Sequence, residues 1–261
     1  MVLPERFAAL SDGLAAGVSA RADLTGLVLL GSASEAGAPR RDDWSDHDFY
    51  AIIRAGQGPA FRPDLSWLPE QERIVLTARE GEIGFVAVYD DGHVMEFALA
   101  EAAELAEAVV GDATVRVDDA DGTLAALVAR GQAKVAAADS FDSVNDARLV
   151  LVKLLIGVGR ARRGETVSAS MFVRAWAVQH LIRAVRGRRA EQSGTLRDAI
   201  DPQRRFERDF PGIAAQIEAG LARPLEDAGR ALFTLLRQEL EPGWDEFPSR
   251  AADAVAARLG W

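Results

Sequence analysis

Asp46 and Asp48 are separated by one residue, a spacing that would let both carboxylates bind one metal ion. Residues two apart in a β-strand point to the same face, so both carboxylates project together while His47 between them turns away. Two adjacent carboxylates repel each other strongly unless a cation lies between them. Because Mg²⁺ prefers such oxygen ligands and also binds phosphate oxygens, the pair predicts a magnesium site for a triphosphate.

A third acid, Glu96, lies in the apolar stretch VMEFAL between Met95 and Phe97. An unpaired carboxylate among apolar neighbours is costly, so we expect Glu96 to have a partner or a metal. A neighbouring strand could bring it beside the aspartate pair. Glu96 would then be a third metal ligand, or the general base that accepts the proton of an acceptor hydroxyl.

Gly31 and Ser32 follow the apolar run Leu27–Leu30, which predicts a buried strand. A glycine lets a triphosphate approach the backbone closely, and the serine hydroxyl and the following N–H groups can donate to phosphate oxygens. We expect this turn to hold the β- and γ-phosphates, with an in-line displacement at the α-phosphorus. Each motif alone also has a plainer explanation, as a solvated turn or a strand-end cap.

The elements that must position these residues change type along the chain. Strands are predicted near residues 27–30, 48–53, 73–77, 85–89, 94–99 and 113–117, with a helix at 4–22 and a short one at 101–110. Asp91-Gly92 marks the turn of a hairpin. After Gly122 only helical periodicity follows, in the segments 123–138, 142–163, 168–187, 195–200, 212–220, 224–240 and 248–259.

The fold class is therefore α+β: a mixed-sheet domain at 1–122 followed by a helical domain at 123–261, with the active site expected between them. The chain has 261 residues, 49% of them hydrophobic and none cysteine, which excludes disulfides and thiolate chemistry. Residues 1–122 carry 9 Arg and no Lys against 23 acidic residues, and the remainder has a net charge of +4. This balance argues against nonspecific DNA binding. With no apolar run long enough to span a membrane and no secretion signal, we expect a cytoplasmic protein.

The stretch GSASEAGAPRRDDWSDHDFYAII resembles the Gly-Ser and Asp-x-Asp signature of the nucleotidyltransferase superfamily related to polymerase beta. It is most similar to the antibiotic-modifying branch, the streptomycin and other aminoglycoside adenylyltransferases and the lincosamide nucleotidyltransferases. The hairpin YDDGHVMEFAL resembles a later element of that branch, with Glu96 where Asp is more usual. LVKLLIGVGRARRGE is similar to a segment near the nucleotide phosphates, which implies phosphate contacts for Lys153 and Arg160. DPQRRFERDFPG resembles a late motif without an assigned role.

The resemblance implies transfer of a nucleoside monophosphate, with AMP from ATP as the expected donor reaction, to a hydroxyl of a small molecule. A cationic aminoglycoside suits the acidic N-terminal half, and a lincosamide is the second choice. A homodimer is implied as a possibility. Two alternatives stay open: a toxin–antitoxin-type enzyme acting on protein or RNA, and a non-catalytic nucleotide-binding module. Arg174 and His180 share the spacing of a toxin ribonuclease motif, but a salt bridge and a satisfied histidine are the commoner outcome.

Overall fold

The computed structural model describes residues 4–118, 121–138, 140–192 and 200–261. The chain divides into two compact units, unit 1 (Met1–Val135) and unit 2 (Ala136–Trp261). Unit 1 contains a mixed β-sheet flanked by helices, and unit 2 is helical. The predicted α+β class is confirmed.

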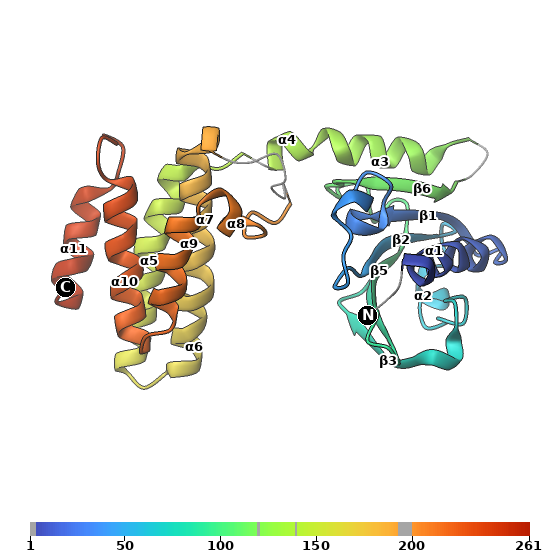
Figure 1. Ribbon diagram of the computed structural model, residues 1–261, viewed down its shortest axis with the longest axis horizontal. Helices are drawn as coiled ribbons and strands as arrows, with labels where there is room; N and C mark the ends of the chain where they lie inside the picture. The colour runs from blue at the N-terminus through green and yellow to red at the C-terminus, as the bar shows by residue number, and fades with distance from the viewer. Residues whose placement is uncertain (1–3, 119–120, 139, 193–199) are drawn as a thin grey trace. The chain divides into compact units, whose positions relative to one another are not determined.

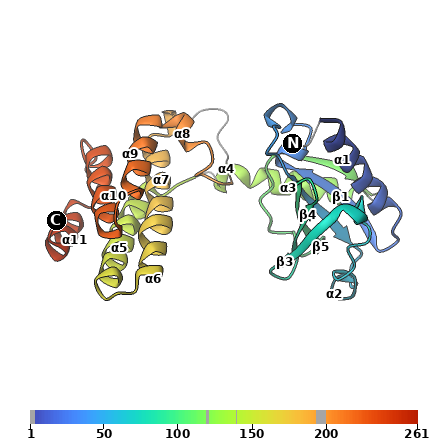
Figure 2. The same ribbon diagram turned by 60° about the horizontal axis from the view of Figure 1, so that its bottom comes forward.

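The strands of unit 1 form one six-stranded sheet in the order β3-β4-β5-β2-β1-β6. The central neighbours β2 and β5 are parallel, whereas the other neighbouring pairs are antiparallel. Because parallel strands run the same way, the first residues of β2 and β5 lie at the same edge of the sheet. Figure 2 shows β3, β4 and β5 side by side. The strands are β1 (Leu24–Leu30), β2 (His47–Ile53), β3 (Ile74–Glu80), β4 (Gly84–Tyr89), β5 (Val94–Glu101) and β6 (Ala113–Val117).

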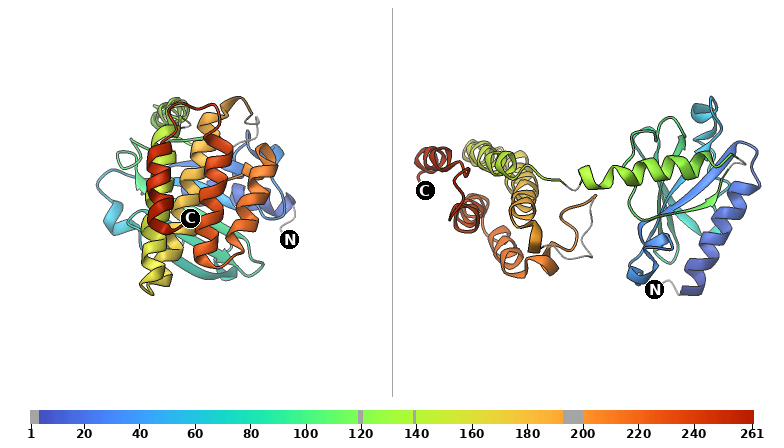
Figure 3. Two further views of the ribbon diagram at one scale, coloured as in Figure 1. Left: turned by 90° about the vertical axis from the view of Figure 1, so that its left-hand side faces the viewer. Right: turned by 90° about the horizontal axis from the view of Figure 1, so that it is seen from above.

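Helices cover both faces of the sheet. On one face, α1 (Pro4–Ser19) packs its apolar side against inward-pointing strand residues such as Phe49 and Leu99. The other face is covered by α3 (Thr123–Ala133), as Figure 3 shows. This helix packs on a smaller cluster that includes Val28 and Ile52. Alternate side chains of β2 thus enter different cores, as the two-residue period of a strand requires. The short α2 (Gly58–Phe61) follows β2.

The division between the units lies after Val135, whereas the sequence placed the boundary after residue 122. The difference is α3, because Leu124, Leu127 and Val128 are buried against the sheet of unit 1. Helical periodicity shows that a segment is a helix but does not show which core it joins.

Residues 101–110 were predicted to be helical, but Glu101 ends β5 and residues 102–107 form a series of turns. The Glu104 carboxylate accepts the backbone N–H of Glu101 at 2.8 Å and pairs with the buried Arg62 guanidinium, which also donates to the carbonyl of Leu99. These bonds involve a distant side chain, so a local helical pattern could not reveal them.

Unit 2 packs its helices around one apolar core, and Figure 1 shows these helices in yellow-green to red. A π-helical segment, Met171–Trp176, interrupts the single helix predicted at 168–187. The predicted helix 195–200 lies almost wholly outside the described residues. The helices of the second half of the chain are α4 (Val135–Ala138), α5 (Ser143–Arg162), α6 (Thr166–Ser170), α7 (Ala177–Arg188), α8 (Phe206–Asp209), α9 (Pro211–Leu221), α10 (Leu225–Leu240) and α11 (Ser249–Leu259).

Arg186, in the last turn of α7, is only 1% exposed. Its guanidinium pairs with Asp209 at 2.6 Å and donates to the carbonyls of Pro202 and Arg204. The stretch DPQRRFERDFPG therefore folds around Arg186, and its described contacts are structural. Burial of this charge is tolerated because its donors are satisfied.

None of the described helices combines the length and the apolar character needed to cross a lipid bilayer.

Candidate functional site

Three carboxylates converge at one edge of the sheet in unit 1. The parallel register places Asp48 opposite Glu96, and Asp46 immediately precedes β2. One carboxylate oxygen from each of Asp46, Asp48 and Glu96 lies within 4.8 Å of the others. The strand pairing thus brings together the three acids singled out in the sequence.

Glu96 differs from the sequence expectation in its surroundings. Its neighbours Met95 and Phe97 are buried on the α1 side of the sheet, but Glu96 points to the opposite face and is exposed. Asp46 and Asp48 are half-buried. The alternation of β5 explains the difference, because an apolar flank on a strand covers the other face. Glu96 is therefore accessible to a ligand from solvent.

The carboxylate cluster carries concentrated negative charge. Among the described residues, neither Asp46 nor Glu96 lies within ion-pair distance of a Lys or Arg side chain. Three carboxylates so close together repel one another unless a cation compensates their charge. Burial, and after it the charge of Asp48, raise the pKa of Tyr50, two residues along the same strand face. An all-carboxylate oxygen set fits a hard divalent cation such as Mg²⁺.

The Gly31-Ser32 turn lies beside this cluster. Leu30, the last residue of β1, pairs with Asp48, and Gly31 has a positive φ of 49° that favours glycine. A Cβ placed on Gly31 would lie 3.5 Å from Oδ2 of Asp48, so the turn is in contact range of the acids. The Ser32 hydroxyl donates to the carbonyl of Asp46 at 3.3 Å. The predicted phosphate-binding turn and the predicted metal ligands are thus direct neighbours.

Arg41 is a residue of this region that the sequence analysis missed. Its Nε and Nη2 both donate to the carbonyl of Ser32, at 3.0 and 2.9 Å. Its guanidinium lies 4.0 Å from the centroid of the Phe7 ring. Burial lowers the pKa of Arg41. Two arginines precede Asp42, and no local signal distinguishes the one that folds back onto the turn.

His47 points away from the acids, as predicted, and is 0% exposed. Its Nε2 lies 2.9 Å from the hydroxyl of Ser11, and its Nδ1 lies 2.7 Å from Nε2 of His93. The ring stacks on Phe7 at 3.8 Å. Burial is the main reason that the pKa of His47 falls to about 3, and the charges of His93 and Arg41 lower it further. His47 is therefore neutral near pH 7.

Lys153 and Arg160 lie on α5 in unit 2. The ammonium of Lys153 is 5.4 Å from the ring centroid of Trp176 and 5.7 Å from that of Phe172. The guanidinium of Arg160 lies 4.4 Å from the Phe172 ring, donates to the Ser168 hydroxyl and pairs with Glu165. Both side chains line the π-helical segment, and their contact with nucleotide phosphates stays a prediction.

Arg174 and His180 have separate structural partners. His180 Nδ1 lies 2.8 Å from Oδ1 of Asp146, whereas Arg174 donates to the carbonyl of Arg223. His180 is thus satisfied as expected, whereas Arg174 bonds to a backbone carbonyl in place of the expected salt bridge. Trp44, which precedes the aspartate pair, is 93% exposed.

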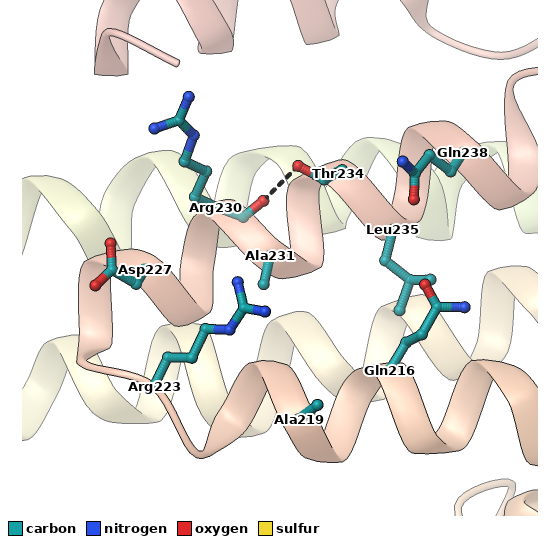
Figure 4. A pocket seen from close by; sticks show the side chains of 9 residues that line it. All are labelled: Gln216, Ala219, Arg223, Asp227, Arg230, Ala231, Thr234, Leu235 and Gln238. Atoms are coloured by element: carbon teal, nitrogen blue, oxygen red, sulfur yellow. Dashed lines mark hydrogen bonds between the residues drawn. The ribbon is translucent and has the colours of Figure 1, made fainter.

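A groove of about 580 Å³ lies between α9 and α10 of unit 2 (Figure 4). Figure 4 shows Arg223 extending between the two helices, while the Thr234 hydroxyl donates to the carbonyl of Arg230. None of the residues predicted to act in catalysis lines this groove.

No family model matches the chain, and no curated protein sequence matches it. Among solved structures, the chain is similar to a nucleotidyltransferase-like protein from Exiguobacterium sibiricum 255-15. The match covers 88% of this chain and 74% of that chain, at 14% identity and a TM-score of 0.35. It is also similar to an aminoglycoside 6-adenyltransferase from Bacillus subtilis, over 96% of this chain and 90% of that chain, at 11% identity and a TM-score of 0.29. The functional interpretation accordingly depends on the chain's own side chains.

Proposed function

We propose that the protein is a magnesium-dependent nucleotidyltransferase that moves a nucleoside monophosphate, with AMP from ATP as the expected case, onto a hydroxyl of a small molecule. The convergence of Asp46, Asp48 and Glu96 within 4.8 Å, beside the Gly31-Ser32 turn, carries this proposal. An acid cluster that could hold a metal ion, next to a glycine turn that phosphates can approach, suits phosphoryl-transfer chemistry.

In this proposal each residue has a defined task. Asp46 and Asp48 hold Mg²⁺, which when bound neutralises charge on the triphosphate. Glu96 completes the metal site or accepts the proton of the acceptor hydroxyl, and its exposure gives an acceptor access to it. The acceptor oxygen forms a bond to the α-phosphorus, the bond from that phosphorus to pyrophosphate breaks, and the released proton goes to the base.

The second part of the proposal concerns the residues that bind the phosphates. Gly31 and Ser32 bind the β- and γ-phosphates through backbone N–H groups and the serine hydroxyl, which exchanges its 3.3 Å bond to the Asp46 carbonyl for a phosphate oxygen. Lys153 and Arg160 are proposed as further phosphate contacts, as the resemblance of their segment implies.

The net charge of the N-terminal half is the basis for the proposed acceptor. The net charge of −14 over residues 1–122 favours a cationic molecule such as an aminoglycoside, and a lincosamide is the second candidate. We place the enzyme in the cytoplasm and include a homodimer in the proposal.

The test is a pyrophosphate-release assay with Mg²⁺, each of four nucleoside triphosphates, and a panel of aminoglycosides and lincosamides. We expect turnover with at least one pair, and its loss in Asp46→Ala. Asp43→Ala, in the same exposed loop, is the matched control and keeps full activity. An Asp46→Ala protein that folds and keeps full activity would show that the metal assignment is wrong. Triphosphate binding without pyrophosphate release would instead indicate a non-catalytic module, and labelling of a co-purified protein or RNA the toxin–antitoxin type.

A further inference from the structure

A stack of three side chains connects the two halves of the proposed site. We propose that Arg41 and His47 are positioning residues, of which Arg41 sets the Ser32 turn and His47 sets the carboxylates. This inference rests on the proposed function, because it concerns how the triphosphate turn and the metal ligands are held. Phe7 of α1 lies between the two residues and contacts both.

Arg41 acts on the turn from its backbone side. Two N–H groups of one planar guanidinium converge on the carbonyl oxygen of Ser32, which fixes the orientation of that peptide plane. The next residue's N–H belongs to the same plane, so Arg41 determines where this donor points. Within the described parts of the chain Arg41 has no carboxylate partner, so its charge stays available to an incoming anion. A Lys at this position keeps the charge but loses the fork.

His47 acts on the carboxylates from behind the sheet. It lies between Asp46 and Asp48 in the chain, so a shift of its backbone moves both ligands together. Its ring is stacked on Phe7 with an interplanar angle of 21°. The ring is fully buried, and a side chain without free space holds its backbone in place.

A directed hydrogen-bond chain passes through His47. The Ser11 hydroxyl donates to the carbonyl of Phe7 at 3.1 Å, so its oxygen accepts from Nε2–H of His47. With the proton of His47 assigned to Nε2, its Nδ1 accepts from Nε2–H of His93. The Ser11 hydroxyl, both ring nitrogens of His47 and Nε2 of His93 thus have defined roles.

The chain joins three elements at the edge where the acids meet. His93 immediately precedes β5, which carries Glu96, while His47 begins β2 and Ser11 belongs to α1. The Nδ1–Nε2 bond of 2.7 Å therefore links the starts of the two strands whose pairing sets Asp48 opposite Glu96. Partners behind metal ligands commonly hold them in this way, and their loss costs 10–100-fold in metal affinity.

We therefore expect substitutions of Arg41 and His47 to change different constants, the KM for the triphosphate and the Kd for Mn²⁺. Arg41→Lys is expected to raise the KM for the triphosphate roughly tenfold, as the loss of a forked bond to a carbonyl implies, with the Kd for Mn²⁺ unchanged. His47→Phe keeps an aromatic ring against Phe7 but removes both hydrogen bonds. We expect it to weaken Mn²⁺ binding about tenfold. A purely structural role would lower the melting temperature without this division.

The experiment measures Mn²⁺ binding by electron paramagnetic resonance on the full chain, steady-state KM and kcat, and melting temperature. Arg54→Lys is the matched control, because Arg54 also donates from Nε and Nη2 to one carbonyl, that of Ala22, at the far end of β2. Arg54→Lys should leave Mn²⁺ binding and KM unchanged. If His47→Phe does not fold, Phe7→Leu tests the same stack and should change both constants.

The outcomes distinguish the two proposals. Folded Arg41→Lys and His47→Phe proteins with wild-type KM and wild-type Mn²⁺ affinity would overturn the positioning roles while leaving the proposed function intact. Equal effects of Arg41→Lys and Arg54→Lys would overturn the role of Arg41. A wild-type protein that neither binds Mn²⁺ nor releases pyrophosphate would remove the proposed function itself, and the positioning inference with it.

Discussion

Each unit contains an aspartate that is at least partly buried, and the charged groups beside this aspartate differ between the two units. In unit 2, Asp146 is 3% exposed and lies against two basic side chains, with His180 at 2.8 Å and Arg183 at 3.2 Å. In unit 1, Asp46 lies beside two other carboxylates. A buried carboxylate that serves the fold receives its partners from the fold, whereas three carboxylates gathered around one point are suited to an external cation.

The largest effect expected from this comparison is on activity. Asp48→Asn removes one charge from the cluster at nearly constant volume. Mg²⁺ then loses a ligand, and the triphosphate loses the ion that would connect it to the carboxylates. We expect pyrophosphate release to fall by about 10³-fold. Steady-state assays across Mg²⁺ concentration check this, and recovery of the rate at high Mg²⁺ would reduce Asp48 to a minor ligand.

Asp146→Ala should act on stability instead. The change leaves His180 and the partly exposed Arg183 without their carboxylate, and we expect a loss of about 2–3 kcal/mol in unfolding free energy. Urea denaturation measures the loss, and Mn²⁺ affinity should not change. Equal stability of the variant and the wild type would show that the pairing of Asp146 is incidental.

The histidine pair behind the acids gives a pH dependence. Because the pKa of His47 is about 3 in the folded state and about 6.5 in the unfolded chain, only the unfolded state takes up a proton between these values. The contribution of His47 to the free energy of unfolding is therefore fully present above pH 6.5 and decreases as the pH falls toward 3. Between pH 7 and pH 5 we expect a loss of about 1–2 kcal/mol. Urea titrations of the wild type and His47→Phe compare the slopes, and parallel slopes would argue against this origin.

The smallest expected effect is a gain in stability. In the absence of divalent cations, Asp46→Asn relieves repulsion among the three carboxylates and should stabilise the protein by about 0.5 kcal/mol. Thermal melts in a chelating buffer measure the gain. Addition of Mg²⁺ should reverse the order, since only the wild type binds it. If Asp46→Asn were less stable than the wild type without metal, Asp46 would stabilise the fold through partners within the protein, as Asp146 does.

The local features of the fold followed from the sequence. The strands containing Leu27, Phe49 and Phe97, and the Asp91-Gly92 hairpin turn, lie where apolar runs and turn residues predicted them. The spacing of Asp46 and Asp48 likewise indicated a shared face.

The remainder depends on contacts distant in the chain. Arg41 reaches Ser32, His47 reaches Ser11 and His93, and Arg186 reaches Asp209. Such contacts are determined by how elements pack, and no single stretch of sequence contains them. The exposure of Glu96 was misjudged for a related reason, because its apolar neighbours face the opposite side of the sheet.

The parallel pairing of β2 with β5 also has a consequence for folding kinetics. These strands are adjacent in the sheet but are separated in the chain by β3 and β4, so their pairing requires a large loop to close. Non-local pairing of this kind is slow compared with hairpin formation. The carboxylate cluster should therefore appear late during refolding, after the β4–β5 hairpin, and the recovery of Mn²⁺ binding would time the completion of the sheet.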